Sequence, residues 1–303
     1  MGVQACVVVD SDLRSITPEW IRLLASPIIR KEFDYVTPHY LRHKYDGTIT
    51  KNIAYPLTRM LYGLDVRQPI GGDFGFSGGL AETFLGRNVW GSDVARFGID
   101  IWMTTTAINT GGRICQAPVG VKIHQAKDPA ETLGPMFRQV VGTLFALMRL
   151  YEERWHRVQG SKAVPLCGTQ QGGRLEPIGV TPSTMLDKLR AGQETFHDLW
   201  SQILTAKNLA SVDLATSKDY EEFDFPAQLW ARIVMDFAIA YNKSPLPSDR
   251  VMEAMIPLYL GRTAAFVKQT SEMTTQEAER VVQAQAEIFE GLRSYLRERW
   301  DNP

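Results

Sequence analysis

The sequence predicts an α/β protein, with a mixed sheet and flanking helices in residues 1–130 and a mainly α-helical region in residues 131–303. Short apolar segments and glycine-rich turns fill the first region, whereas apolar residues recur at helical spacing in the second. The chain has 303 residues, of which 44% are hydrophobic and 22% charged. These proportions are typical of a globular protein with a large core.

The first apolar segment, residues 5–9, shows no alternation, which predicts a strand buried on both faces of a parallel sheet. Asp10 and Asp12 follow at its carboxyl end. In open α/β sheets the ligand crevice lies outside the carboxyl ends of the strands. We therefore expect the two aspartates to lie at such a crevice.

The rest of the first region divides into segments with recognisable patterns. The Thr-Pro-Glu sequence at residues 17–19 predicts the start of a helix. Residues 33–40 predict a strand that its proline closes, and residues 50–63 predict a helix that its proline kinks. Residues 68–86 predict a glycine-rich strand or turn and then a helix, and residues 112–125 a pair of strands.

The second region predicts a series of helices. Their ranges are 131–159, 183–208, 226–241, 248–270 and 274–296. The last range begins with a Thr-x-x-Glu capping box and keeps an apolar stripe along one face.

Charge, hydropathy and cysteine content exclude several classes of protein. The formal net charge of −1 is too small to attract nucleic acid or acidic membranes. The longest apolar helical stretch is shorter than the roughly 20 residues that span a bilayer. Cys6, Cys115 and Cys167 are odd in number and far apart, which favours reduced thiols. We expect a cytoplasmic protein with no membrane span and no nucleic-acid partner.

Asp10 and Asp12 offer hard carboxylate oxygens to Mg²⁺ or Mn²⁺, which commonly complete their coordination with phosphate oxygens. A strand-end turn with a helix cap also fits this pair, and that alternative stays open.

Another alternative is a phosphohydrolase of the haloacid dehalogenase type that uses Asp10. Its motifs expect threonine or valine where this chain has Arg14, and aspartate where it has Ser77. Both departures count against this alternative.

Three later stretches suit small ligands. Residues 42–52 gather cations and hydroxyls around a turn, as a carboxylate site requires. Residues 68–79 are rich in glycine, which lets backbone approach a ligand closely. Residues 90–108 place Asp93 and Asp100 near tryptophans, and acids beside aromatic rings suit a sugar. Each stretch alone also fits a simpler description: a solvated loop, a tight turn, or a core strand beside surface acids.

Five stretches in this order resemble the retaining GT-A glycosyltransferases that make mannosylglycerate and, more distantly, the glucosyl-phosphoglycerate synthases. They are VVVDSD, RHKYDGTITKN, QPIGGDFGFSGG, FGIDIWMTTTAI and GVKIH, within residues 3–155. The resemblance implies a partial, GT-A-like fold for the first region. It implies transfer of mannose or glucose from a nucleoside-diphosphate sugar, preferably GDP-mannose, to D-glycerate or a similar small acid. It also implies Mg²⁺ or Mn²⁺ as cofactor.

The resemblance assigns the donor side of the site residue by residue. Asp10 and Asp12 correspond to donor-binding residues, and Asp12 with His124 to the metal ligands. A lone histidine such as His124 is otherwise more often a core or loop group. Gly72 and Asp73 correspond to the loop that shapes the donor sugar pocket.

On the acceptor side, Arg42, Thr48 and Thr50 correspond to the residues that bind the glycerate carboxylate and hydroxyls. Asp73 and Asp100 correspond to the acids at the catalytic centre. Because the family attacks from the front face of the sugar, we expect Asp100 to position hydroxyls rather than act as a base.

In that family, a segment that recognises the nucleotide precedes the D-x-D strand, whereas nine residues precede Asp10 here. We therefore expect that segment to be missing from this polypeptide, and the activity of the chain alone is an open question. A third alternative is a non-catalytic fragment whose carboxyl-terminal helices mediate oligomerisation. Those helices could also form a homo-oligomer of an active enzyme.

Overall fold

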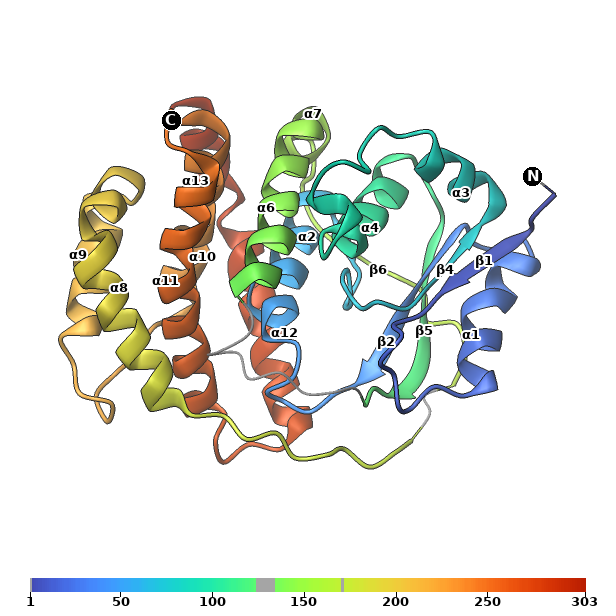
Figure 1. Ribbon diagram of the computed structural model, residues 1–303, viewed down its shortest axis with the longest axis horizontal. Helices are drawn as coiled ribbons and strands as arrows, with labels where there is room; N and C mark the ends of the chain where they lie inside the picture. The colour runs from blue at the N-terminus through green and yellow to red at the C-terminus, as the bar shows by residue number, and fades with distance from the viewer. Residues whose placement is uncertain (1, 124–133, 170–171) are drawn as a thin grey trace.

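A four-stranded sheet flanked by helices lies beside a group of carboxyl-terminal helices in the computed structural model (Figure 1). The structure describes residues 2–123, 134–169 and 172–303. The sheet consists of β1 (Ala5–Val8), β4 (Phe74–Ser77), β2 (Tyr35–Leu41) and β5 (Ile114–Val121), in that spatial order. Two short strands, β3 (Leu64–Asp65) and β6 (Lys162–Ala163), form a separate parallel pair. The predicted α/β class with a mixed sheet is confirmed.

The directions of the strands bring distant parts of the sequence to one end of the sheet. β4 runs antiparallel to both β1 and β2, and β2 runs parallel to β5. The carboxyl ends of β1, β2 and β5 therefore lie at the same end of the sheet as the amino end of β4. Segments that follow three strands and the loop that precedes the fourth meet there.

The prediction that β1 lies inside a parallel sheet is wrong. β1 is an edge strand whose partner, β4, is antiparallel, and Val8 is 36% exposed. Ala5 and Val7 pack against one hydrophobic cluster and Cys6 against another, so both faces are partly covered. Partial cover of both faces explains why the segment lacks alternation without being an interior strand.

Helices cover both faces of the sheet. Those of the first region are α1 (Pro18–Ile29), α2 (Tyr55–Tyr62), α3 (Gly78–Leu85) and α4 (Ile99–Asn109). α1 contacts all four strands on one side, and α4 packs on β2 from the other (Figure 1). α1 begins after Thr17 with proline in its first turn, as predicted.

Pro38 does not close its strand, contrary to the prediction. β2 continues through Pro38 to Leu41, because β4 pairs only with Tyr35 and Val36 and leaves that side of the strand open beyond them. Before Pro56, the predicted helix begins with a π-helical segment, η1 (Thr50–Ala54). Within the described part of the range 112–125, which ends at residue 123, the structure has the single strand β5 rather than a strand pair.

The second region is helical, as predicted. Its helices are α6 (Gly134–Leu150), α7 (Glu152–His156), α8 (Pro182–Ile203), α9 (Ala206–Thr216), α10 (Ala227–Lys243), α11 (Ser248–Gln269), α12 (Thr275–Gly291) and α13 (Arg293–Asp301). The predicted capping box is present, because Thr274 and Glu277 bond reciprocally at the start of α12. No helix in the described ranges is both long and apolar enough to cross a bilayer.

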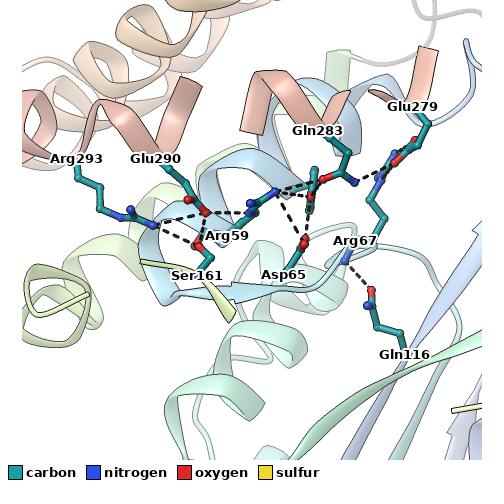
Figure 2. A network of polar contacts seen from close by, with 10 residues as sticks. Arg59, Asp65, Arg67, Gln116, Ser161, Glu279, Gln283, Glu290 and Arg293 are labelled. Carbon is teal, nitrogen blue, oxygen red and sulfur yellow. Dashed lines mark hydrogen bonds and ion pairs between the residues drawn. The ribbon is translucent and has the colours of Figure 1, made fainter. Parts of the chain in front are cut away.

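One hydrophobic cluster joins both regions. Phe74 of β4, Phe145 of α6 and Trp230 of α10 all belong to it. A polar network also ties α12 to α2 and to the chain after β3 (Figure 2). In it, Arg59 donates to Glu290 at 2.8 Å, and Arg67 donates two hydrogen bonds to Glu279.

Candidate functional site

A cleft with a volume of about 260 Å³ opens at the edge where the strand ends meet. Its lining consists of Asp10, Asp12, Arg42, Tyr45, Asp46, Gly47, Thr48, Ile49, Thr50, Ile70, Gly71, Gly72, Phe97, Asp100, Lys122, Met136, Val140 and Ile178. Seven of the nine residues predicted for the site are in this set. The other two are Asp73, which lies beneath the cleft, and His124, which lies outside the described residues.

The strand directions explain this convergence. Asp10 and Asp12 follow β1, the turn that begins with Arg42 follows β2, and Lys122 directly follows β5. Gly72 directly precedes the residue before β4. Side chains that are more than a hundred residues apart in sequence therefore share one cleft.

Lys122 is the central cation of the acidic side of the cleft. Its Nζ donates to Asp10 Oδ2 at 2.7 Å, to the Gly71 carbonyl at 2.6 Å and to Asp73 Oδ2 at 3.1 Å. The side chain is 3% exposed, so these three acceptors satisfy an almost fully buried ammonium group. Lys122 therefore partly offsets the charge of the two carboxylates and ties the loop before β4 to the segment after β1.

Asp73 supports the cleft from below. It is 0% exposed, and its Oδ1 accepts the backbone N–H of Asp10 at 3.0 Å. Its Oδ2 also accepts the hydroxyl of Tyr40. Burial and the neighbouring Asp73 raise the pKa of Tyr40 well above its ordinary value, so this hydroxyl keeps its proton and donates. Asp73 does not line the cleft, and its contacts make it a positioning residue for Asp10.

Gly72 is required by the position of Asp10. The backbone of Gly72 has a φ of +76°, in the left-handed region that favours glycine. A Cβ at this position would lie 2.1 Å from both carboxylate oxygens of Asp10. The glycine therefore allows the Asp10 carboxylate to lie directly against the loop.

Asp100 holds the same loop from α4. Its Oδ2 accepts the N–H groups of Gly71 and Gly72 at 3.0 and 2.7 Å. Burial and the negative charge of Asp10 together raise the pKa of Asp100 to about 6, although the two N–H donors and Lys122 oppose the shift. In the first turn of α4 this carboxylate fixes the glycine loop and still lines the cleft.

The turn after β2 forms the cationic side of the cleft. Arg42 Nε donates to Asp46 Oδ2 at 2.7 Å, and the guanidinium lies over Gly47, whose φ is +63°. Lys51 is buried, and its Nζ donates to three backbone carbonyl groups of residues 43, 44 and 46. Lys51 therefore holds the turn from inside and does not line the cleft.

Two threonines follow this turn at the start of a helical segment. Thr48 and Thr50 are 2% and 3% exposed, respectively. Thr48 Oγ1 and the hydroxyl of Tyr259, from α11, are 2.5 Å apart. The hydroxyl of Thr48 is therefore already paired within the protein. The N–H groups of the first turn of a helix have no intrahelical acceptor, and here they adjoin the cleft.

The acidic pair fits a divalent cation in part. Asp12 is exposed in the cleft, and none of the described residues pairs with its carboxylate. Asp10 is already paired with Lys122. Within the described ranges, the one group of three possible metal ligands is Glu152, His156 and Asp301, which are not part of the cleft lining. A cation in the cleft would thus take Asp12 as its direct ligand.

The segment after β5 lies against the loop after Asp12. Arg14 N–H donates to the Ile123 carbonyl at 2.9 Å, and Ile123 N–H donates to Ser15 Oγ at 2.9 Å. Ile123 is the last described residue before His124, whose role as a metal ligand stays a prediction.

No family model matches the chain, and no curated protein matches its sequence.

The position of Ser77 counts further against the haloacid dehalogenase alternative. In that alternative, this position would add a metal ligand. Ser77 instead ends β4 away from the cleft, and its Oγ accepts Leu80 N–H as the cap of α3. A carboxylate at this position would lie at the opposite end of β4 from Asp73.

Sequence reasoning missed Lys122 and Tyr40. Lys122 directly follows the apolar run of β5, and a lysine there is a signal that a buried carboxylate needs a cation. Tyr40 carries no such signal, because a tyrosine in an apolar strand is usually a core residue.

Proposed function

We propose that the protein is a metal-dependent retaining glycosyltransferase with a GT-A-like catalytic region. It would transfer a hexose, mannose or glucose, from a nucleoside diphosphate to D-glycerate or a similar small hydroxy acid. One observation carries this proposal: a single cleft contains both an acidic set suited to a metal diphosphate and a cationic turn suited to a small carboxylate. The five-motif resemblance to the mannosylglycerate-forming enzymes supports it.

The donor side follows from Asp10, Asp12, Gly72 and Asp100. A divalent cation bound at Asp12 would offset the negative charge that develops on the departing diphosphate. Asp10 stays paired with Lys122, so its role is to bind ribose or a metal-bound water. Asp100 fixes the glycine loop through Oδ2 and leaves Oδ1 for sugar hydroxyls.

The acceptor side follows from the turn after β2. Arg42, whose Nε donates to Asp46, lines the cleft and would bind the acceptor carboxylate through its planar guanidinium. The backbone N–H groups at Thr48 and Thr50 favour the same negative charge. Holding the acceptor hydroxyl beside the sugar supplies much of the rate through proximity.

Donor binding provides the first test. Titration calorimetry of the full chain with GDP and UDP, each with Mn²⁺, Mg²⁺ or EDTA, should show metal-dependent binding. Asp12→Ala and His124→Ala should each abolish it, and Ser11→Ala is the matched control in the same turn. If both variants bound nucleotide normally, the metal-site assignment would be wrong.

Acceptor recognition provides the second test, in an assay that detects the hexosyl product by mass spectrometry. Loss of a charge-assisted hydrogen bond costs about 1.5–3 kcal/mol, so Arg42→Ala should raise the KM for glycerate roughly ten- to a hundredfold. The KM for the donor should change little. Arg22→Ala, on the exposed face of α1, is the control. Equal changes in both KM values would remove Arg42 from the acceptor site.

A folded chain that binds no nucleotide diphosphate and forms no product would favour the non-catalytic alternative. A covalent phosphoryl group trapped on Asp10 would favour the phosphohydrolase.

A further inference from the structure

A second cavity of about 740 Å³ lies along α11 and α12, beside the segment that precedes α10. Its volume falls within the roughly 300–1,000 Å³ that is usual for small-molecule sites. Apolar side chains of Pro226, Val281 and Ile288 line it, together with two arginines, Arg262 and Arg280. None of these residues belongs to the cleft described above.

Arg262 is a buried cation without an acidic partner. It is 2% exposed, and its Nε donates to Gln285 Oε1 at 2.9 Å and its Nη1 to the Phe225 carbonyl at 3.0 Å. Both acceptors are neutral. No carboxylate among the described residues forms an ion pair with it, and Nη2 has no acceptor there. Nη2 is not fully buried, so it reaches the surface of the cavity.

Such a cation is unusual because buried charges in proteins are nearly always paired. Burial lowers the pKa of Arg262 to about 10, and Asp224 only partly opposes the shift. Asp224 is exposed at the cavity and does not approach within ion-pair distance of the guanidinium. An anion in the cavity would supply the missing negative charge.

Arg280 adds a second cation at the edge of the cavity. It is exposed on α12 and forms no ion pair with any described residue. Glu277, the nearest acid on the same helix face, is engaged in the capping box, where it accepts Thr274 N–H at 2.7 Å. Both arginines therefore line the cavity without an ion pair to a described residue.

The wall of the cavity is fixed in place. Glu279, Gln283 and Glu290, on another face of α12, bond to α2 and to the chain around β3 (Figure 2). Gln285, which holds Arg262, also donates to the Lys51 carbonyl at 2.9 Å. Arg262 is thus pre-organised, which reduces the entropy cost of binding a ligand.

We propose that this cavity binds a small organic carboxylate with an apolar body. The carboxylate would lie on Arg262 and Arg280, whose planar guanidinium groups suit its geometry. The apolar body would pack along Pro226, Val281 and Ile288. This site is independent of the proposed glycosyl transfer, and its test needs no activity measurement.

Octanoate is the probe, measured by titration calorimetry with the full chain. Octanol has the same body without the charge, and acetate has the charge without the body. We expect saturable 1:1 binding of octanoate, at least about tenfold tighter than octanol or acetate, because a charge-assisted hydrogen bond alone is worth a factor of this size. Equal binding of octanol, or no saturable octanoate binding at millimolar concentrations, would overturn the proposal.

Variants then locate the site. Arg262→Lys keeps the buried charge but loses the guanidinium fork, and Arg280→Ala changes an exposed side chain that folding does not need. Each should weaken octanoate binding by about tenfold, whereas Arg250→Ala, an exposed arginine of α11, should leave it unchanged. Asp224→Asn, which removes the competing acid, should tighten it. Unchanged affinity in both Arg262→Lys and Arg280→Ala, with near-ultraviolet circular dichroism showing native folds, would reject the site.

Discussion

Gly72→Ala is the substitution that most directly tests the geometry of the cleft. The added Cβ would lie 2.1 Å from both carboxylate oxygens of Asp10, and the backbone φ of +76° is unfavourable for any residue with a Cβ. The Asp10 carboxylate cannot simply rotate away, because its Oδ2 is bonded to Lys122 at 2.7 Å. Either the carboxylate leaves Lys122 or the glycine loop leaves Asp100.

The magnitude has two parts. A left-handed backbone conformation costs an alanine about 1–2 kcal/mol. Loss of the Asp10–Lys122 pair adds only about 1 kcal/mol, because the Asp10 side chain is 42% exposed and solvent screens the pair. We therefore expect the free energy of unfolding to fall by about 2–3 kcal/mol.

Urea unfolding followed by tryptophan fluorescence measures this change, with Gly79→Ala as the matched control. Gly79 is exposed in α3, and no atom lies within 4 Å of the place that a Cβ would take there. Its substitution should alter stability by less than about 0.5 kcal/mol. In an Asp10→Ala background, the cost of Gly72→Ala should fall to its backbone part, about 1–2 kcal/mol. If Gly72→Ala unfolded at the wild-type urea concentration, the contact with Asp10 would be refuted.

Three further predictions follow from the same contacts. Lys122→Met should lower the free energy of unfolding by about 3 kcal/mol, because it leaves buried Asp73 without a cation. In urea unfolding, the double variant with Asp73→Asn should recover part of this loss. Asp100→Asn should gain stability relative to wild type as the pH rises from about 4 to about 7 in EDTA. Because the pKa of Asp100 is raised from 3.8 to about 6 in the folded state, the wild type loses about 2 kcal/mol across that window. A constant difference between the two proteins would contradict the shift. Tyr259→Phe removes the hydroxyl paired with Thr48, so it should lower the free energy of unfolding by about 1 kcal/mol. It should also raise the acceptor KM more than the donor KM, and equal changes in both would argue against this positioning role.

The sequence is a good guide to which residues meet, because strand ends can be recognised from local patterns. Asp10, Arg42 and Gly72 each stand at the end of an apolar strand or in a glycine turn, and such positions gather at one edge of a sheet. The capping box at Thr274 is equally local, and the structure confirms it.

What the sequence does not predict depends on pairing between distant segments. An apolar run looks the same in an interior strand as in an edge strand with both faces partly covered, and β1 is the second kind. Asp73 and Lys51 stand in or beside turns, where charged residues are usually exposed. From this position alone, both would be expected to face the cleft. Both are buried, because each has partners that arrive from elsewhere: Lys122 for Asp73, and three carbonyl groups for Lys51.

The helical region contributes directly to the geometry of the cleft. Tyr259 of α11 bonds Thr48, and Trp230 Nε1 of α10 donates to the Asn52 carbonyl at 2.7 Å. Gln285 of α12 donates to the Lys51 carbonyl. Each contact reaches the segment that follows the cationic turn, so three separate helices fix the residues expected to hold the acceptor. The change in composition near residue 130 therefore marks a change in secondary structure within one shared core, and the cationic side of the cleft depends on both regions.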